Sequence, residues 1–302
     1  MIARRVELSV LGKRGKEMQN NRRAIPTYAK STAPLSAEQV ADFAARGYLV
    51  IDLALESSFM DALITGVEPQ YPADRQQNPT APARVQDAWK QVDVVRQLAV
   101  NPLVLGALEQ LLGRAALPFQ TLNFPIGTRQ LTHSDTIHFN AKPSGFMAGV
   151  WVALEDIDLD NGPLQYYPGS HLLREYSLQD FGLEPGYENY RHYESRIQGL
   201  VEAEGLLPSF GTIGRGQAFI WHANLLHGGA AQTDLTRSRH SQVTHYYFED
   251  CEYFTPMNSG PAGPALRDPF WIPATSDFVL PEDSFSAKTK RLAKSVLSRL
   301  TQ

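Results

Sequence analysis

Cysteine is almost missing from this sequence of 302 residues, in which Cys251 stands alone. A chain with one cysteine forms no internal disulfide, and such chains are typical of reducing compartments, so we expect a cytoplasmic protein. No apolar run is long enough to cross a bilayer, which predicts that no segment spans a membrane. Arg4, Arg5 and Glu7 interrupt the N-terminal segment, where a signal peptide needs a continuous apolar stretch.

The body of the chain also lacks an excess of positive charge. The formal net charge is −4, although residues 1–33 carry eight Lys or Arg against two Glu. Residues 285–302 carry five basic residues and no acid, so the segment between the two ends is acidic. A nucleic-acid-binding core is expected to have a basic face, and we therefore expect no nucleic-acid partner. Residues 1–33 are polar and unpatterned, which predicts a basic, disordered N-terminal extension.

Helical signals dominate the part of the chain that follows this extension. Ser36 and Gln39 form a capping box, which opens a helix that ends near Gly47. Asn101 and the proline after it are a cap and a first turn. The predicted elements are a strand over 48–52 and helices over about 36–47, 57–66 and 101–113.

From Pro118 onward, short stretches rich in β-branched and aromatic residues alternate with turn signals, as in all-β sandwiches and barrels. The predicted strands are 119–124, 146–154, 164–167, 217–221 and 241–248. The interval 172–208 lacks strand alternation, and we expect it to be a lid inserted over one mouth of a barrel. Apolar residues at helical spacing predict a C-terminal helix over 286–302, which packs on the body or on a second copy of the chain. Residues 34–302 are expected to form a single domain.

One short motif carries the clearest chemistry. His133 and Asp135 are two residues apart, and on a strand such residues point to the same side, so an imidazole and a carboxylate would meet at one point. Two histidines and one carboxylate are typical of non-haem iron(II) oxygenases, because they leave adjacent coordination positions open. His227, which precedes two glycines, is the candidate third ligand, and we expect it at the end of a strand.

A second pair follows shortly after His227. Arg239 and Ser241 are again two residues apart, and a guanidinium with a hydroxyl on one strand face can bind a carboxylate. Each motif is weak by itself. Their order, in which His-x-Asp is followed by a distant His and then by Arg, is much harder to obtain by chance.

This ordered set resembles the phytanoyl-CoA dioxygenase family of iron(II)- and 2-oxoglutarate-dependent oxygenases. Further stretches that resemble the family are 47–51, 151–156 and Asn161-Gly-Pro-Leu-Gln-Tyr-Tyr-Pro-Gly-Ser-His171, and the likeness covers roughly residues 36–250. The resemblance implies a mainly β fold with flanking helices, built on a double-stranded β-helix of the jelly-roll or cupin kind. It also implies a dioxygenase that uses iron(II), 2-oxoglutarate and O2, hydroxylates a small organic substrate and releases succinate and CO2.

Carried over position by position, the resemblance makes His133, Asp135 and His227 the metal ligands. Arg239 or Arg237 would hold the distal carboxylate of 2-oxoglutarate, with Ser241 beside Arg239 and Trp151 lining the cosubstrate site. The family spacing falls between the two arginines, and we favour Arg239 because of its serine neighbour. Asp135 is retained where halogenating relatives have a small residue, which favours oxygenation.

Several alternatives stay open from the sequence alone. His138 is a rival ligand that we expect to line the pocket instead. His171 and His222 are expected to be structural, His240 to point outward and His245 to point inward. Trp151 could line the cosubstrate site or could simply be a buried aromatic residue of the core. A cupin-like metal-binding or sensor protein, and a desaturating or cyclising oxygenase on the same triad, are the alternative functions. Further candidate pocket residues are Asn140, Lys142, Arg191 and Tyr247.

Overall fold

The structure is a computed structural model, and it describes residues 24–72 and 83–278. Its largest sheet has six strands in the order β1-β8-β5-β10-β3-β2, a second has three in the order β7-β6-β9, and a third pairs β11 with β4. All pairings are antiparallel. The strand bounds are β1 (Tyr48–Asp52), β2 (Val85–Gln86), β3 (Ala116–Phe124), β4 (Asn140–Lys142), β5 (Met147–Ala153), β6 (Leu164–Tyr166), β7 (Ser209–Gly211), β8 (Gln217–His222), β9 (His227–Gly229), β10 (Ser241–Phe248) and β11 (Glu252–Phe254).

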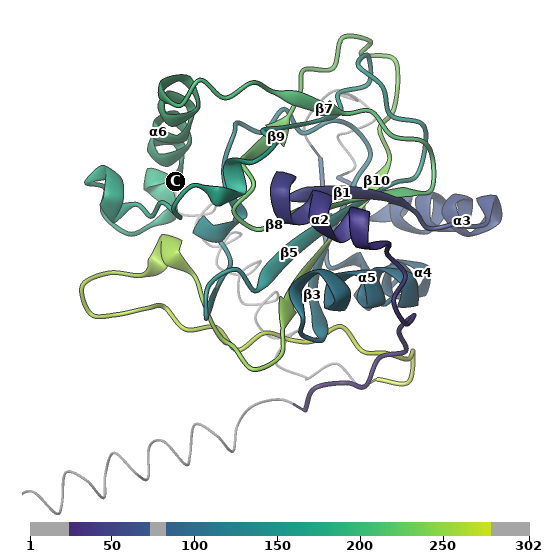
Figure 1. The fold of residues 1–302 in the computed structure, drawn as a ribbon. Coiled ribbons are helices and arrows are strands. Elements are labelled where there is room, and N and C mark those ends of the chain that lie inside the picture. Colours follow the sequence, from purple (N-terminus) through teal and green to yellow (C-terminus); the bar gives the residue numbers. More distant parts are fainter. Residues whose placement is uncertain (1–23, 73–82, 279–302) are drawn as a thin grey trace, which may run out of the picture.

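Helices gather on one side of the six-stranded sheet, while α6 stands apart at the edge of the molecule (Figure 1). The helix bounds are α2 (Ala37–Arg46), α3 (Ser57–Val67), α4 (Asp93–Ala99), α5 (Pro102–Leu112) and α6 (Tyr190–Ala203), with short 3₁₀ turns η1 (Glu68–Gln70), η3 (Ala88–Lys90), η4 (Asp135–Ile137), η5 (Ser170–Leu172), η6 (Gln179–Phe181), η7 (Tyr187–Asn189) and η8 (Pro256–Asn258). The capping box of Ser36 and Gln39 is present, and Gly47 ends α2 in the left-handed conformation, as the sequence predicts.

The six-stranded sheet separates two apolar regions because successive side chains of a strand point to opposite faces. Val150 and Val152 of β5 pack with the helices in the main core. Trp151, which lies between them, points the other way and packs with Phe219 and Trp221 of β8 in a second cluster. The opposite face of this sheet therefore presents large aromatic side chains toward the three-stranded sheet.

The strands expected after Pro118 are all present to within a few residues, and the antiparallel sheets with flanking helices confirm the mainly β fold class. The interval 172–208 contains η6, η7 and α6 and lacks a strand, and its role as a lid stays a prediction. The C-terminal helix expected over 286–302 lies outside the described residues.

Part of the expected N-terminal extension lies against the body of the protein. The hydroxyl of Tyr28 donates a hydrogen bond to the carbonyl of Ile272 at 2.7 Å. The backbone N–H of Ser31 donates to the carbonyl of Pro102 at 2.9 Å. Residues 24–33 therefore pack beside α5, and residues 1–23 lie outside the described part of the chain.

Candidate metal centre

His133 and His227 face each other across a two-residue bridge. The backbone N–H of each donates to the carbonyl of the other at 2.9 Å. His227 also begins strand β9, where it pairs with Tyr166 of β6, so the expectation that it ends a strand was wrong. The bridge places the two imidazoles side by side, with ring centroids 4.5 Å apart.

The expected strand through Asp135 was also wrong. Beyond the single bridge at His133, the chain turns into the 3₁₀ turn η4, which begins at Asp135. The cause is local, because the Ser134 hydroxyl caps this turn and the Asp135 N–H donates to the carbonyl of Ala223 at 3.0 Å. His133 and Asp135 still converge, but a turn brings them together rather than strand alternation.

Three potential ligand atoms meet in this place. One nitrogen of each of His133 and His227 and one oxygen of Asp135 lie within 4.8 Å of one another, and all three residues are buried. The nearest carboxylate oxygens of Asp135 lie 3.6 Å from Nε2 of His133 and 3.9 Å from Nε2 of His227. A metal ion that binds these atoms meets two imidazole nitrogens and a carboxylate, the donor set of the non-haem iron(II) facial triad.

The tautomers of the two histidines are set by backbone carbonyls. Nδ1 of His133 lies 2.9 Å from the carbonyl oxygen of Leu131, and Nδ1 of His227 lies 2.9 Å from that of Leu225. A carbonyl only accepts, so each Nδ1 carries a proton, and Nε2 is the nitrogen of each ring that can bind a metal ion. Burial lowers the pKa of His227 to about 4, which leaves this ring neutral at pH 7.

Asp135 is oriented by a tryptophan. Nε1 of Trp221 in β8 donates a hydrogen bond of 2.8 Å to a carboxylate oxygen of Asp135. Burial opposes the ionisation of Asp135, but the adjacent imidazoles of His227 and His133 outweigh it and hold its pKa well below the usual range. The carboxylate is therefore ionised and fixed in direction.

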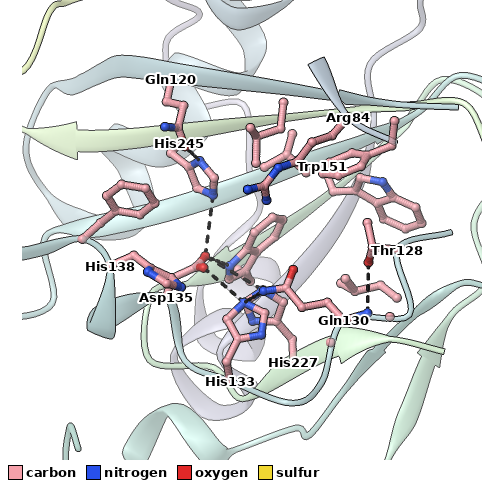
Figure 2. Close-up of a pocket in the computed structure, with 18 of the residues that line it drawn as sticks. Arg84, Gln120, Thr128, Gln130, His133, Asp135, His138, Trp151, His227 and His245 are labelled. Atoms are coloured by element: carbon pink, nitrogen blue, oxygen red, sulfur yellow. Dashed lines mark hydrogen bonds and ion pairs between the residues drawn. The ribbon is translucent and has the colours of Figure 1, made fainter. Parts of the chain in front are cut away.

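A cavity of about 390 Å³ opens over these residues. His133, Asp135 and His227 line it together with Trp151 and Arg239, and Figure 2 shows the first four of these around one space. The cavity lies between the aromatic face of the six-stranded sheet and strand β9.

Arg239 is a buried cation at the wall of this cavity. Only 4% of its surface is exposed. Its guanidinium lies 5.3 Å from the Trp151 ring, and Nη1 donates to the Ser241 hydroxyl at 3.3 Å. Burial lowers the pKa of Arg239 to about 10, against the opposing influence of Glu155, so the group stays charged at pH 7. Its Nε has no hydrogen-bond partner among the described residues.

Arg237 lies elsewhere. It is half exposed, and its Nη1 contacts both carboxylate oxygens of Asp158 at 2.8 and 2.7 Å. Strand β10 begins only at Ser241, so the expected strand pair of Arg239 and Ser241 was wrong. Arg239 instead precedes the strand, where its N–H donates to the carbonyl of Pro125 at 2.9 Å.

The other histidines divide between the cavity and the scaffold. His138 and His245 line the cavity. Nε2 of His245 lies 3.8 Å from Asp135, whereas His138 stacks on Tyr187 with ring centroids 5.9 Å apart. His171, His222 and His240 lie outside the lining and contact Ala44, Asn224 and Glu155, respectively.

The further pocket candidates were wrong, since none of them lines the cavity. Asn140 donates to Glu175, Lys142 lies over the Phe254 ring, and the side chain of Tyr247 is packed against Phe119. Arg191 is exposed on α6.

Sequence reasoning missed Trp221 and Gln130. Strand alternation puts Trp221 on the same inward face as Phe219, a signal that was available. Gln130 lies on an irregular segment, where its amide contacts Nε2 of His133 at 3.3 Å and donates to the Tyr190 hydroxyl at 3.1 Å. No periodic pattern marks such a residue.

Comparison with known proteins identifies the family. The sequence model of phytanoyl-CoA dioxygenase matches residues 28–241. The chain belongs to this family. A probable phytanoyl-CoA dioxygenase of Caenorhabditis elegans is 25% identical over 266 residues, which cover 76% of this chain and 81% of that protein. A phytanoyl-CoA dioxygenase domain-containing protein 1 of Danio rerio is 27% identical over 168 residues. These residues cover 52% of this chain and 48% of that relative.

Solved structures share the fold of this family member. EctD from S. alaskensis with bound Fe superimposes with a TM-score of 0.60 at 20% identity, covering 84% of this chain and 93% of EctD. The non-heme alpha ketoglutarate dependent carbocyclase SnoK gives a TM-score of 0.59 at 19% identity, covering 74% of this chain and 89% of SnoK. The jelly-roll fold and the class of iron(II)- and 2-oxoglutarate-dependent dioxygenase follow from the family. In the described ranges, no helix is both long and apolar enough to cross a bilayer.

Proposed function

We propose that this protein is a dioxygenase that hydroxylates a small organic substrate, with His133, Asp135 and His227 as its iron ligands. In the same proposal, Arg239 and Ser241 bind the distal carboxylate of 2-oxoglutarate, and Trp151 lines the site that receives it. The observation that carries the proposal is the presence of both features in one cavity: three convergent ligand atoms and a buried arginine. A metal-binding or sensor protein needs only the first.

The residues of the cavity fit both iron(II) and 2-oxoglutarate. Two imidazole Nε2 atoms and an ionised carboxylate are the donors that iron(II) takes in a facial triad. A buried charge is costly unless an opposite charge accompanies it. Among the described residues, no ion pair joins Arg239 to a carboxylate, and a dicarboxylic acid in the cavity would supply one.

When bound, iron with 2-oxoglutarate supplies the oxidising power for O2 activation. The protein supplies position. Backbone carbonyls fix both histidine rings, and Trp221 fixes the Asp135 carboxylate. Arg239 would orient the cosubstrate by a charge-assisted contact, and the rings of Trp151 and Phe124 on that side keep water away from it.

Succinate formation tests the proposal. The purified protein with iron(II), 2-oxoglutarate and O2 should form succinate slowly even without a substrate, and His227→Ala should form none. His222→Ala is the matched control, because His222 is a partly buried histidine outside the cavity. A wild-type protein that binds iron tightly but forms no succinate would support the sensor alternative.

Reactions other than hydroxylation are known for proteins with the same fold. Structures with the same fold include proteins described as a carbocyclase and an epimerase, both alpha ketoglutarate dependent. A desaturating or cyclising reaction on the same triad is therefore the second candidate. Product analysis by mass separates them, since hydroxylation adds one oxygen atom and desaturation or cyclisation removes two hydrogen atoms.

A further inference from the structure

Positively charged side chains outnumber negatively charged ones in the lining of the cavity. Arg84, Arg239 and Arg267 are its three arginines, and Asp135 is its single carboxylate among the described residues. Under the proposed function, on which this inference rests, the iron ion and Arg239 are balanced by Asp135 and by the two carboxylates of 2-oxoglutarate. Arg84 and Arg267 then remain without a counter-charge. A cleft lined by one sign of charge attracts ligands of the other sign.

Arg267 is held in place on the wall of the cavity. Its backbone N–H donates to the carbonyl of Tyr253 at 2.8 Å, and Nη1 donates to the Thr255 hydroxyl at 3.1 Å. The guanidinium lies 4.9 Å from the Phe139 ring and 5.7 Å from the Phe119 ring. Stacking against aromatic rings fixes the plane of a guanidinium and leaves its remaining N–H groups to bind an anion.

Other arginines of the protein have acidic partners. Arg96, Arg174 and Arg237 form ion pairs with Asp93, Asp180 and Asp158 at 2.6–2.7 Å. Within the described part of the chain, neither Arg84 nor Arg267 forms an ion pair with a carboxylate. Surface arginines often lack partners without consequence, but these two share one cavity.

The two arginines also lie near the metal centre. Both line the cavity that also contains His133, Asp135 and His227. His245 is 3.8 Å from Asp135, and its ring centroid is 5.0 Å from that of Phe139. Phe139 therefore contacts both Arg267 and His245, and its ring offers a flat apolar surface for a carbon framework.

We propose that the substrate is an organic acid, whose oxyanion is bound by Arg267 and Arg84 while its carbon framework lies on Phe139 and extends to the metal centre. A carboxylate and a phosphate ester share the required chemistry, because arginine binds both through paired N–H donors. The cavity, at about 390 Å³, is near the lower limit of ligand pockets and also receives the cosubstrate, so the buried part of the substrate is small.

The test measures how fast phenylglyoxal modifies each arginine, by mass spectrometry of peptides. Acetate and inorganic phosphate are the two probes, each added in excess to the full-length protein. Either probe should slow the modification of Arg84 and Arg267 by roughly fivefold or more, as expected when an anion bridges charged donors. Arg196, which is exposed on α6, is the internal control and should react at an unchanged rate.

A variant shows whether the two arginines share one anion. In Arg267→Gln, the probe concentration that half-protects Arg84 from phenylglyoxal should rise by about tenfold. In Arg196→Gln, this concentration should not change. Protection by acetate alone indicates a carboxylic acid, and protection by phosphate alone indicates a phosphate ester. Equal modification rates with and without both probes, or undiminished protection of Arg84 in Arg267→Gln, would overturn the proposal.

The labelling needs neither metal nor turnover, so its outcome is separate from that of succinate formation. Succinate without protection rejects the acid site and retains the dioxygenase. Protection without succinate rejects the proposed function and retains an anion site.

Discussion

Trp221 and Asp135 are joined by a buried hydrogen bond of 2.8 Å, in which the indole Nε1 donates to the carboxylate. The bond links the six-stranded sheet to the turn that carries Asp135. It needs space beside the indole, and Gly149 provides that space, since it pairs with Trp221 across β5 and β8. A Cβ atom at Gly149 would lie 2.1 Å from the Trp221 ring.

Trp221→Phe should weaken iron(II) binding by about 10- to 100-fold, because it removes the donor that orients a metal-ligand carboxylate. Anaerobic titration with iron(II) measures the affinity. Trp89→Phe is the control, because the Trp89 indole also donates to a carboxylate, that of Asp87 at 3.3 Å, but lies outside the cavity. Equal effects of the two changes would mean that Trp221 acts only through packing.

Gly149→Ala should lower the free energy of unfolding by about 1–3 kcal/mol, because the added methyl group forces the Trp221 ring to move. Gly199→Ala, in α6, makes the same chemical change, and beyond its chain neighbours and the backbone of its own helix no heavy atom lies within 4 Å of the new Cβ. It should raise the free energy of unfolding by about 0.5–1 kcal/mol, since alanine favours a helix. Urea unfolding of both variants compares them, and an unaffected Gly149→Ala would contradict the described packing.

Asp135→Ala should sharply weaken iron(II) binding and abolish succinate formation, since it removes one of three ligands. His138→Ala should leave iron affinity within about threefold of wild type, because His138 lines the cavity without joining the ligand cluster. Calorimetry or equilibrium dialysis without oxygen gives both affinities. Retained activity in Asp135→Ala, with loss in His138→Ala, would assign the third ligand to His138.

Arg239→Ala should raise the 2-oxoglutarate concentration needed for half-maximal turnover by about 10- to 100-fold, the value of a buried charge-assisted contact of about 1.5–3 kcal/mol. Arg237→Ala should change this concentration little, because Arg237 pairs with Asp158 at the surface. Succinate formation over a range of 2-oxoglutarate concentrations measures it. The reverse pattern would assign the carboxylate site to Arg237.

Much of the fold could be predicted from local sequence signals, because caps, turns and β-branched residues act directly on the backbone conformation near them. The capping box at Ser36 and the β-branched runs after Pro118 placed helices and strands to within a few residues. His133, Asp135 and His227 lie in one cavity, as expected, but the strand alternation predicted for His133 and Asp135 was wrong. A turn capped by Ser134 brings them together, and such a turn has no period.

What the sequence left out depends on long-range contacts. Trp221 meets Asp135 from 86 residues away, and Arg267 reaches the cavity from the segment that follows β11. Asn140 and Lys142 flank the site in sequence but contact Glu175 and Phe254 instead. Proximity along the chain is therefore a poor guide to the lining of this cavity, because strands far apart in sequence build it.

The visible spectrum of the oxygen-free protein with iron(II) and 2-oxoglutarate tests the central claim most directly. If His133, Asp135 and His227 hold iron and Arg239 places 2-oxoglutarate beside it, a charge-transfer band should appear when both are added, and oxygen should bleach it. Neither addition alone should produce the band. A protein that binds iron(II) but never develops the band at saturating 2-oxoglutarate would contradict the account.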